Sequence, residues 1–485
     1  MYAMIKRYSL PVLLLVLIAS CSGDNSGITE FFPVRVNNLY GFMDRAGKMT
    51  VTPQYAQAGC FVDGLALTGS TGEKIKWGYI DMTGKYFVYP AYTDASNFSE
   101  GIAFVVSENG EPQAIDKNGT VKFTVKDAEQ VQNFRDGLAA YSVLTETGEQ
   151  WGFLDKEGKT KIQPKFAGTG FFSDGFCPVV NEDGKWGYIN KEGNVVIDYR
   201  FDNVSPFYGN VAKVYADGLW GLVDNTGKYL VKPQYTGIDM DKDKFLVEQE
   251  GKFGWIDKTG KVIIDIRYGD AFPFNDSKYA AVRSGSKWGY IDNAGKFIIN
   301  PQFDFAFGFD GDIAPVRVND KVGFVNVSGK VVVPPSFDDI SMDYYLRFFA
   351  NTSAFSGVIT NNNTPKFVGY KWLIKFYHLQ FEEAKMVSTD DTKTLLTQFV
   401  SLSSLMPDSS KQEMMKIRVG VLDCRDSGRN AVLTYITSDN PGKQQGLYLV
   451  KNDDKWLVQF SKNDAMAGST DSTATADAPG DNNSK

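Results

Sequence analysis

Histidine is almost absent from this sequence. The 485 residues include one histidine, so a site with several histidines is excluded and any Ser-His-Asp or Cys-His system would have to use His378. His378 falls in a predicted amphipathic helix, where packing or surface exposure is the ordinary role of a lone histidine. Gly-rich phosphate loops and dinucleotide fingerprints are also missing. The sequence therefore predicts no catalytic residue, no cofactor and no metal site, and we expect a protein that is not an enzyme.

Cysteine is scarce as well. Apart from Cys21, three cysteines remain, an odd number without C-x-x-C spacing: Cys60, Cys177 and Cys424. This pattern argues against a disulfide framework and against a structural zinc site. Cys60 and Cys177 occupy equivalent places in the internal repeat described below, where small apolar residues usually stand. We expect both in the core.

An excess of positive charge is missing too. The 51 Lys and Arg residues are outnumbered by 58 Asp and Glu, the formal net charge is −7, and no long basic run occurs. Neither nucleic acid nor an anionic membrane surface is therefore predicted as a partner. Apolar residues make up 43% and aromatic residues 14% of the chain, a composition that favours strands over helical bundles.

The apolar run near the N-terminus is short. Residues 10–19 are too few to cross a bilayer core of about 30 Å, and they follow the basic Lys6 and Arg7, which is typical of a cleaved signal peptide. The run ends in Leu17-Ile18-Ala19-Ser20-Cys21, which resembles the bacterial lipoprotein signal, with Cys21 as the acylated residue. The alternative is an ordinary secretory peptide with an incidental cysteine.

The lipoprotein resemblance implies a location. Residues 1–20 are then removed, residues 21–30 form a tether, and acyl chains on Cys21 anchor the protein, since each buried CH₂ contributes about 0.8 kcal/mol. No aspartate directly follows Cys21, which by resemblance to enterobacterial sorting favours the outer membrane. We expect a lipid-anchored protein of the bacterial cell envelope, on either the periplasmic or the surface face.

What the sequence has in abundance is one repeated pattern. Nine copies, called tiles here, align on a central glycine with a period of about 35 residues, which is typical of solenoids, propellers and arrays. The aligned residues are Gly41, Gly78, Ala114 in a degenerate third tile, Gly152, Gly187, Gly221, Gly254, Gly289 and Gly323.

Every tile carries an Asp or Asn followed three residues later by Gly. We expect the side chain to bond a backbone N–H two residues on, while glycine supplies the positive φ that closes a hairpin. A Pro-x-aromatic sequence then usually ends the second strand, because proline cannot donate to the sheet. A third short strand follows the hairpin. The sequence therefore predicts three short strands per tile. The turn pairs are Asp44/Gly47, Asp81/Gly84, Asp116/Gly119, Asp155/Gly158, Asn190/Gly193, Asp224/Gly227, Asp257/Gly260, Asp292/Gly295 and Asn326/Gly329.

Five tiles place tryptophan directly before the central glycine. These pairs are Trp77-Gly78, Trp151-Gly152, Trp186-Gly187, Trp220-Gly221 and Trp288-Gly289. Together with the strand that follows, they resemble the WG (or KWG) repeat family of bacterial proteins. The resemblance implies an all-β repeat protein, commonly exported or surface-linked, without shared catalytic residues. In the other four tiles the tryptophan position holds Tyr40, Gln113, Phe253 and Val322, so we interpret it as a packing position.

Two shapes are compatible with tiles over residues 31–340. An open superhelical stack lets each tile bury its aromatic face against the next. A closed β-propeller needs nine blades, above the usual range of about four to eight, and four strands per blade are usual. The sequence favours the open stack, with the closed propeller as the alternative.

The pattern changes after residue 340. Residues 341–365 are predicted as a cap and linker, residues 366–460 as a small α+β domain, and residues 461–485 as a disordered tail. Helices are expected at 370–384 and 390–405, with Ser388 or Thr389 capping the second, followed by four antiparallel strands. The final hairpin, residues 447–458, resembles SnoaL-like cone-shaped domains.

Two readings of function remain. The preferred hypothesis is a non-catalytic envelope scaffold that binds an unidentified protein or glycan. The alternative is a hydrolase acting on glycans or peptidoglycan through paired carboxylates, or a carbohydrate-binding protein that uses aromatic residues at tile ends. Those aromatic sequences are Phe171-Phe172, Phe207-Tyr208 and Phe305-Ala306-Phe307-Gly308-Phe309. Acidic runs at residues 239–243 and 310–312 lack the ligand spacing of a calcium loop, so we interpret them as solvated connections.

Overall fold

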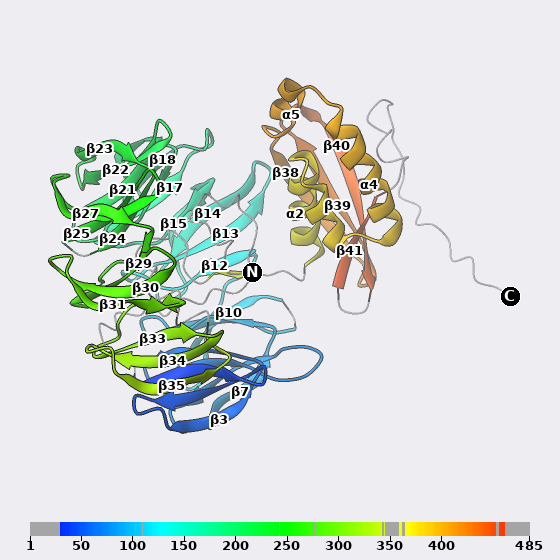
Figure 1. Cartoon of the computed structure of the whole chain (residues 1–485). Helices are drawn as coiled ribbons and strands as arrows, with labels where there is room; N and C mark the ends of the chain where they lie inside the picture. The colour runs from blue at the N-terminus through cyan, green and yellow to red at the C-terminus, as the bar shows by residue number, and fades with distance from the viewer. Residues whose placement is uncertain are drawn as a thin grey trace. The chain divides into compact units, whose positions relative to one another are not determined.

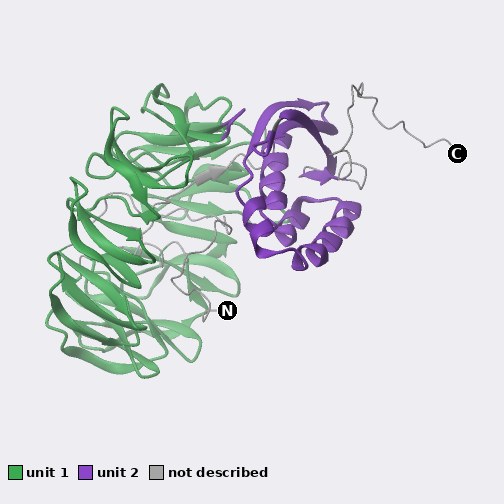
Figure 2. Ribbon diagram, turned by 90° about the horizontal axis from the view of Figure 1, so that it is seen from above, with its two compact units in different colours: residues 1–143, 149–361 green, residues 144–148, 362–485 purple. Residues whose placement is uncertain are grey.

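The computed structural model describes residues 30–460 except 109, 242, 276, 342–343, 345–357, 361–363 and 453–454. The chain forms two compact units, residues 1–143 with 149–361 and residues 144–148 with 362–485 (Figure 2). The first unit contains the tiles and is called the array below. Cys21, the signal sequence and the tail lie outside the described residues, as does most of the predicted cap at 341–365.

The described part of the array consists of nine antiparallel sheets (Figure 1), numbered here as blades 1 to 9. Blade 1 contains β36 (Asp339–Ile340), β1 (Phe31–Val36), β2 (Leu39–Asp44) and β3 (Met49–Tyr55); blade 2 contains β4 (Gln57–Val62), β5 (Leu65–Gly69), β6 (Trp77–Asp81) and β7 (Tyr86–Tyr92); blade 3 contains β8 (Asp94–Ala95), β9 (Ile102–Val106), β10 (Pro112–Asp116) and β11 (Val121–Thr124). Blade 4 contains β12 (Gln130–Gln132), β13 (Ala139–Thr145), β14 (Gly148–Leu154) and β15 (Thr160–Phe166), with β37 (Val358–Thr360) paired to β12 as a fifth strand.

The remaining blades follow the same order. Blade 5 contains β16 (Gly168–Thr169), β17 (Phe176–Val180), β18 (Trp186–Asn190) and β19 (Val195–Phe201); blade 6 contains β20 (Asn203–Val204), β21 (Val211–Ala216), β22 (Leu219–Asp224) and β23 (Tyr229–Tyr235). Blade 7 contains β24 (Gly237–Asp241), β25 (Lys244–Gln249), β26 (Lys252–Asp257) and β27 (Val262–Tyr268); blade 8 contains β28 (Asp270–Ala271), β29 (Tyr279–Ser284), β30 (Lys287–Asp292) and β31 (Phe297–Phe303); blade 9 contains β32 (Phe305–Ala306), β33 (Ile313–Val318), β34 (Lys321–Asn326) and β35 (Val331–Phe337).

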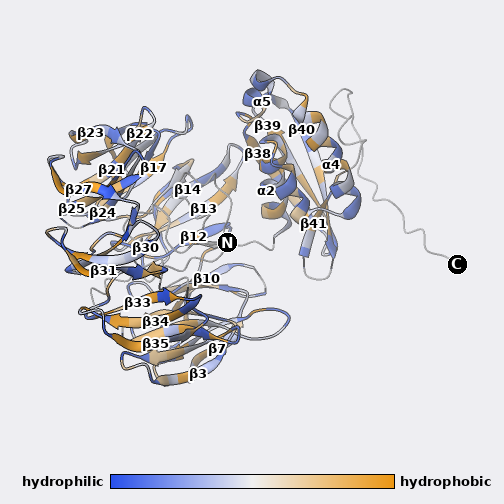
Figure 3. Ribbon diagram, viewed as in Figure 1, coloured by the Kyte–Doolittle hydropathy of each residue, from blue (hydrophilic) through white to orange (hydrophobic). Residues whose placement is uncertain are grey.

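Each blade has at least four strands, one more than the three predicted per tile. The additional strand is short, often two residues, and lies in the segment that follows Pro-x-aromatic, as in β16 and β32. A pair of residues carries no readable alternation of apolar and polar side chains, which is why the sequence pattern missed it. Hydrophobic and hydrophilic residues are mixed along the longer strands, as Figure 3 shows.

The Asp-to-Gly turn closes the last hairpin of every blade through the same bonds. In blade 8, Asp292 Oδ1 accepts hydrogen bonds from the backbone N–H of Ala294 at 2.9 Å and of Lys296 at 3.0 Å. Gly295 has a φ of 75°, and a Cβ on it would come within 3.1 Å of the Ile264 side chain in the preceding blade. The turn therefore fixes its own hairpin and packs on its neighbour. The same two bonds are made by Asp44, Asp81, Asp116, Asp155, Asn190, Asp224, Asp257 and Asn326.

The turn glycines share one backbone conformation but do not all pack equally closely. The φ angle is 77° at Gly158, 80° at Gly227 and 87° at Gly260, and each N–H donates to the carbonyl oxygen of the turn acid three residues earlier. A Cβ would lie 2.6 Å from the Phe123 ring at Gly158 and 2.9 Å from a side chain of the preceding blade at Gly227. At Gly260 the nearest atom, on Val231, is 3.4 Å away, an ordinary contact. Glycine is therefore required at residue 260 only because of the positive φ. The turn of this tile packs less closely on the preceding blade than the turns of the other tiles do.

The central glycine is required by a close backbone approach. A Cβ on Gly289 would lie 2.5 Å from the Ile299 carbonyl oxygen and 2.7 Å from the Pro301 nitrogen, where the register between β30 and β31 shifts. No side chain fits there without moving the neighbouring strand. An added Cβ would meet a backbone atom at 2.5–2.7 Å in every tile with this glycine: Gly41, Gly78, Gly152, Gly187, Gly221, Gly254, Gly289 and Gly323.

The third tile needs a correction of one residue. Ala114 lies opposite Phe104, which is the pairing that Leu222 makes with Lys213 one residue after the central glycine of blade 6. Gln113 therefore takes the glycine position, and Pro112 takes the tryptophan position. The third tile lacks Pro-x-aromatic, and its last strand, β11, is only four residues long. Without the full-length last strand of the other tiles, a side chain fits at residue 113.

The two ends of the array pair with each other. In blade 1, Val34 lies opposite Ile340 and Arg35 opposite Asp339, with backbone bonds from Asp338 N to Arg35 O at 2.9 Å and from Ser341 N to Pro33 O at 3.0 Å. A Cβ on Gly47 would lie 2.7 Å from Val333 of blade 9, so the first turn packs on the last blade as later turns pack on the blade before them. A single apolar cluster spans both blades. Figure 1 likewise shows β3 beside β35.

These contacts decide between the two shapes considered. The all-β repeat array followed by a small α+β domain is confirmed, and no sheet of the described residues curls into a barrel. The open stack leaves the first and last tiles apart, whereas here they pair, so the arrangement of the sheets is the closed alternative. Closure was disfavoured from the sequence on two grounds, nine blades and three strands per tile. The short fourth strand removes the second ground, and the nine blades are observed.

The second unit combines helices with one antiparallel sheet. The helices are α2 (Pro365–Tyr377), α3 (Phe381–Ala384), the 3₁₀ helix Lys385–Val387, α4 (Asp390–Ser404) and α5 (Asp408–Met414), and the strands are β38 (Val419–Asp426), β39 (Asn430–Thr437), β40 (Asn440–Asn452) and β41 (Lys455–Gln459). Trp372, Leu396 and Leu433 are fully buried in its core. Thr364 caps α2 by accepting the Phe367 N–H, whereas Thr389, at the N-cap of α4, makes no side-chain cap bond.

Candidate functional site

The repeat-signature residues are distributed around the array, one turn and one central glycine to a blade. Trp77, Trp151 and Trp288 are buried, and Trp186 and Trp220 are partly buried. These rings pack between blades, which agrees with a packing role for the tryptophan position. The turn acids are likewise engaged in structure and do not converge on one point.

The turn glycines are spread in the same way. Gly158 follows β14 in blade 4, Gly227 follows β22 in blade 6, and Gly260 follows β26 in blade 7. Each lies beside the turn acid of its own hairpin and not beside the glycine of another. The structure therefore brings no two of them into one site, and their role is confined to the hairpin.

The surroundings of three turn acids, Asp81, Asp224 and Asp257, also lower their pKa values. The Thr83 hydroxyl donates to Asp81 and, with backbone N–H groups, lowers the pKa of that carboxyl; Thr226 does the same for Asp224. Hydrogen bonds to the charged form favour it. These carboxylates are therefore ionised acceptors, and the Oδ1 atom of each accepts all the hydrogen bonds that the side chain makes in its turn.

Most aromatic residues predicted for carbohydrate stacking at tile ends are buried. Phe172, Phe207, Phe307 and Phe309 are at most 4% exposed. Phe309, for example, packs edge-on against Tyr290 with ring centroids 4.6 Å apart. The aromatic sequences at tile ends therefore mostly join blades, as expected for core residues, and these buried rings offer no surface for the alternative of carbohydrate stacking. Large residues after a glycine-rich turn are favoured equally by core packing, which is why the sequence did not separate the two roles.

The two acidic runs are bound to protein groups. Arg45 Nη2 lies 2.8 Å from the Asp310 carbonyl oxygen and 2.5 Å from Asp312 Oδ1. Asp241 accepts hydrogen bonds from Trp255 Nε1 at 2.9 Å and from Phe274 N at 2.8 Å, while burial raises its pKa to about 6. The contacts of Arg45 with Asp310 and Asp312, and those of Asp241 with Trp255 and Phe274, thus hold segments of the array together. Among the described residues, no group of three or more His, Cys, Asp or Glu side chains is placed to hold a metal ion.

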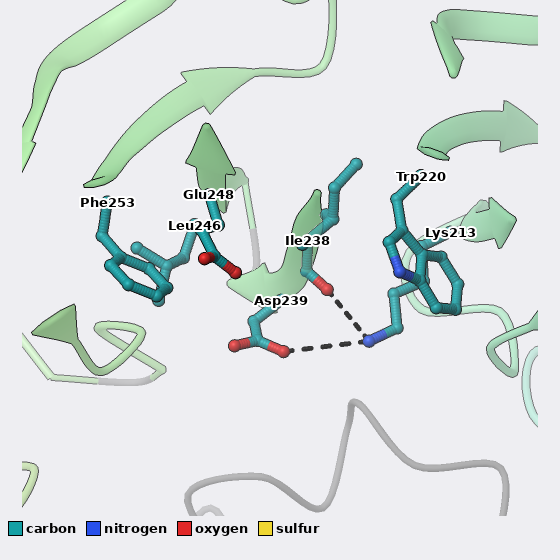
Figure 4. A pocket seen from close by; sticks show the side chains of 8 residues that line it. Lys213, Trp220, Ile238, Asp239, Leu246, Glu248 and Phe253 are labelled. Atoms are coloured by element: carbon teal, nitrogen blue, oxygen red, sulfur yellow. Dashed lines mark hydrogen bonds and ion pairs between the residues drawn. The ribbon is translucent and has the colours of Figure 1, made fainter. Parts of the chain in front are cut away.

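A small cavity lies between blades 6 and 7 (Figure 4). Its volume is about 70 Å³, room for a few waters and far below the roughly 300 Å³ at which ligand pockets begin. Lys213 Nζ donates to the Ile238 carbonyl oxygen at 2.9 Å, lies 3.8 Å from Asp239 Oδ1 and sits 5.0 Å from the centroid of the Trp220 ring. Glu248 and Phe253 complete the wall.

Lys213 was not found from the sequence, although a signal existed. Lys213 follows Ala212 on β21 and faces Leu222, the residue after the central glycine Gly221. All other tiles have an apolar residue there: Pro33, Leu67, Phe104, Ala140, Pro178, Leu246, Ala281 and Pro315. A buried lysine needs its partners within reach, so this arrangement specifies the junction between blades 6 and 7. The cavity is too small for a substrate, and we treat it as a structural ion-pair site.

A second tile-specific feature lies on β7 of blade 2. Phe87 is 50% exposed and Tyr89 71% exposed, whereas most aromatic residues of the array are buried. At the place of Tyr89 the other tiles have Thr52, Thr124, Gln163, Asp198, Lys232, Asp265, Asn300 or Pro334. No other tile has an aromatic residue at either place. Neither residue belongs to the repeated motif, so the motif positions alone do not reveal this pair.

The comparisons with known proteins agree with the tiles. The family model for the WG containing repeat matches eight segments that together cover more than half of the chain: residues 40–68, 77–110, 151–186, 186–220, 220–253, 253–288, 288–321 and 323–345. The chain belongs to the WG-repeat family. The unmatched stretch between 110 and 151 contains the third hairpin, where Gln113 replaces the central glycine. No curated protein matches the sequence.

This WG-repeat protein is also similar to solved structures at low identity. The computationally designed Ika8 protein aligns with 12% identity over 57% of this chain and 96% of that one, with a TM-score of 0.34. BamB from Moraxella catarrhalis aligns with 14% identity over 63% and 97%, again at 0.34, and PorZ from Porphyromonas gingivalis with 10% identity over 62% and 45%, at 0.26. Among the described residues, none of the helices is long and apolar enough to cross a membrane.

Proposed function

We propose that this WG-repeat protein is a non-catalytic binding platform of the bacterial cell envelope, with the α+β unit as a second binding module. The observation that carries the proposal is the use of the repeated residues. Each turn acid is occupied by two backbone amides, and each central glycine by a neighbouring strand. Residues that differ between tiles, such as Tyr89, are then the ones left to recognise a partner.

The proposal is tested by capture. Purified full-length protein is immobilised and incubated with detergent-solubilised envelope, with heat-unfolded protein on matched beads as the control, while release of soluble fragments from peptidoglycan is measured in parallel. We expect a protein or glycan retained by the folded protein alone, and no fragment release above background. Fragment release that is lost on replacing a pair of carboxylates, with no partner retained, would contradict the proposal and favour the hydrolase.

We also propose that Cys21 carries the lipid anchor. Because acyl chains on this residue supply the membrane attachment, Cys21→Ala is expected to move the protein from the membrane fraction to the soluble fraction. Fractionation followed by immunoblotting measures the shift, and Cys424→Ala is the matched control because it removes a cysteine elsewhere in the chain. Retention of the Cys21→Ala protein in membranes refutes lipidation at this residue.

A further inference from the structure

The exposed face of β7 is the strongest unexplained surface of the array. Phe87 and Tyr89 are two residues apart and therefore project from the same face of this strand. In the same blade, Ile75 is 38% and Met82 47% exposed, so blade 2 has four large exposed apolar residues. We call the surface formed by Tyr86, Phe87 and Tyr89 the β7 aromatic surface.

This surface is supported from beneath. The Tyr86 ring lies 5.7 Å from the Tyr89 ring, and Tyr55 of blade 1 packs edge-on against Tyr86 with centroids 6.0 Å apart. The Tyr55 hydroxyl in turn donates to the Gly84 carbonyl oxygen at 3.0 Å, in the hairpin turn that precedes β7. A row of rings thus connects the buried Tyr55 to the exposed Tyr89. Rings held in this way lose little conformational entropy when a ligand binds.

Two classes of partner could use an exposed strand with aromatic residues. A partner protein could add a strand to the edge of blade 2, where β7 is the last strand of the sheet. That edge strand is bulged, because three residues of β7 between Val88 and Tyr92 lie opposite the single Gly78 of β6, and a bulge on an edge strand hinders such pairing. A glycan does not need the backbone edge, because its C–H faces lie against the partly negative faces of aromatic rings.

From this geometry we infer that the β7 aromatic surface binds a glycan by stacking sugar rings on Tyr89 and Phe87. The inference rests on the proposed binding function and names the ligand class of one of its surfaces. The flat Tyr and Phe rings supply stacking area. The hydroxyls of Tyr86 and Tyr89 supply polar groups for sugar hydroxyls.

The test uses the full-length protein with purified peptidoglycan sacculi, soluble xylan, hydroxyethylcellulose and chitohexaose as probes. We expect at least one probe to bind, and Tyr89→Ala and Phe87→Ala each to weaken that binding by about tenfold, as removal of an aromatic hot spot does. Tyr89→Phe keeps the ring and should stay within about threefold of the wild type. Tyr229→Ala, which removes a tyrosine 36% exposed on β23, is the matched control and should leave binding unchanged.

Three outcomes overturn the inference. The first is that the wild type binds none of the probes. The second is that Tyr89→Ala binds the probe as tightly as the wild type does. The third is that Tyr89→Ala instead loses a protein partner captured from the envelope. In the last two cases the proposed binding function stands while the assignment of the β7 aromatic surface to glycans fails. Circular dichroism of each variant confirms that the fold is intact, since both side chains are exposed and their removal leaves the core unchanged.

Discussion

Gly289→Ala is expected to destabilise the array by about 3 kcal/mol or more, an unusually large effect for the addition of one methyl group. The added Cβ would lie 2.5 Å from the Ile299 carbonyl oxygen and 2.7 Å from the Pro301 nitrogen. Both are backbone atoms, so relief requires β31 to move away from β30, which breaks the pairing of Trp288 with Phe303. Denaturant unfolding followed by tryptophan fluorescence measures the loss.

The third tile provides the matched control for this prediction. Gln113 already carries a side chain at the equivalent position of blade 3, so Gln113→Ala is expected to change the unfolding free energy by less than about 1 kcal/mol. If Gly289→Ala were as mild as Gln113→Ala, the close approach would be no constraint and the central glycine would need another explanation. A Gln113→Gly change that stabilised the protein would equally contradict our account of the third tile.

The local structure of a tile was predictable from the sequence. An Asp or Asn three residues before Gly specifies a turn by bonds within five residues, and the structure has those bonds in all nine tiles, from Asp44 to Asn326. The tryptophan position also proved to be a packing position, as its replacement by Phe253 and Val322 indicated. Features determined by neighbours along the chain recur in every tile, because the same local hydrogen bonds form in each copy.

Features that depend on distant contacts were not predictable in this way. Closure depends on Asp339 and Ile340 pairing with Arg35 and Val34, and two-residue strands leave no period in the sequence. The looser packing at Gly260, compared with Gly158 and Gly227, likewise depends on the blade before it and leaves no mark on the turn motif.

The side chains that distinguish one tile from another, Lys213 and Tyr89, stand outside the repeated motif. Their burial or exposure is decided by the neighbouring blade and by the position of the strand in its sheet. A comparison of equivalent positions across tiles would have found both, because each differs in type from its counterparts in all other tiles.

Closure of the ring predicts a large gain in stability from one cross-link. Val34 and Ile340 lie opposite each other across β1 and β36, so their Cα atoms are within the range that a disulfide spans. In a chain with Cys21 and Cys424 replaced by serine, Val34→Cys with Ile340→Cys is expected to form the disulfide under mild oxidation. Because the bond closes a loop of about 300 residues, oxidised protein should be about 5–6 kcal/mol more stable than the same protein reduced.

Comparison of oxidised with reduced protein isolates the cross-link, since both forms lack the same two core side chains. Val34→Cys with Val214→Cys is the matched control, because Val214 faces Gly221 in blade 6 as Val34 faces Gly41 in blade 1, yet it pairs with no strand of blade 1. That pair should stay reduced. Denaturant midpoints and thiol titration give both results. An open array would show the reverse for the first pair, with free thiols after oxidation and no gain in stability, because the residues that follow blade 9 would then never meet β1.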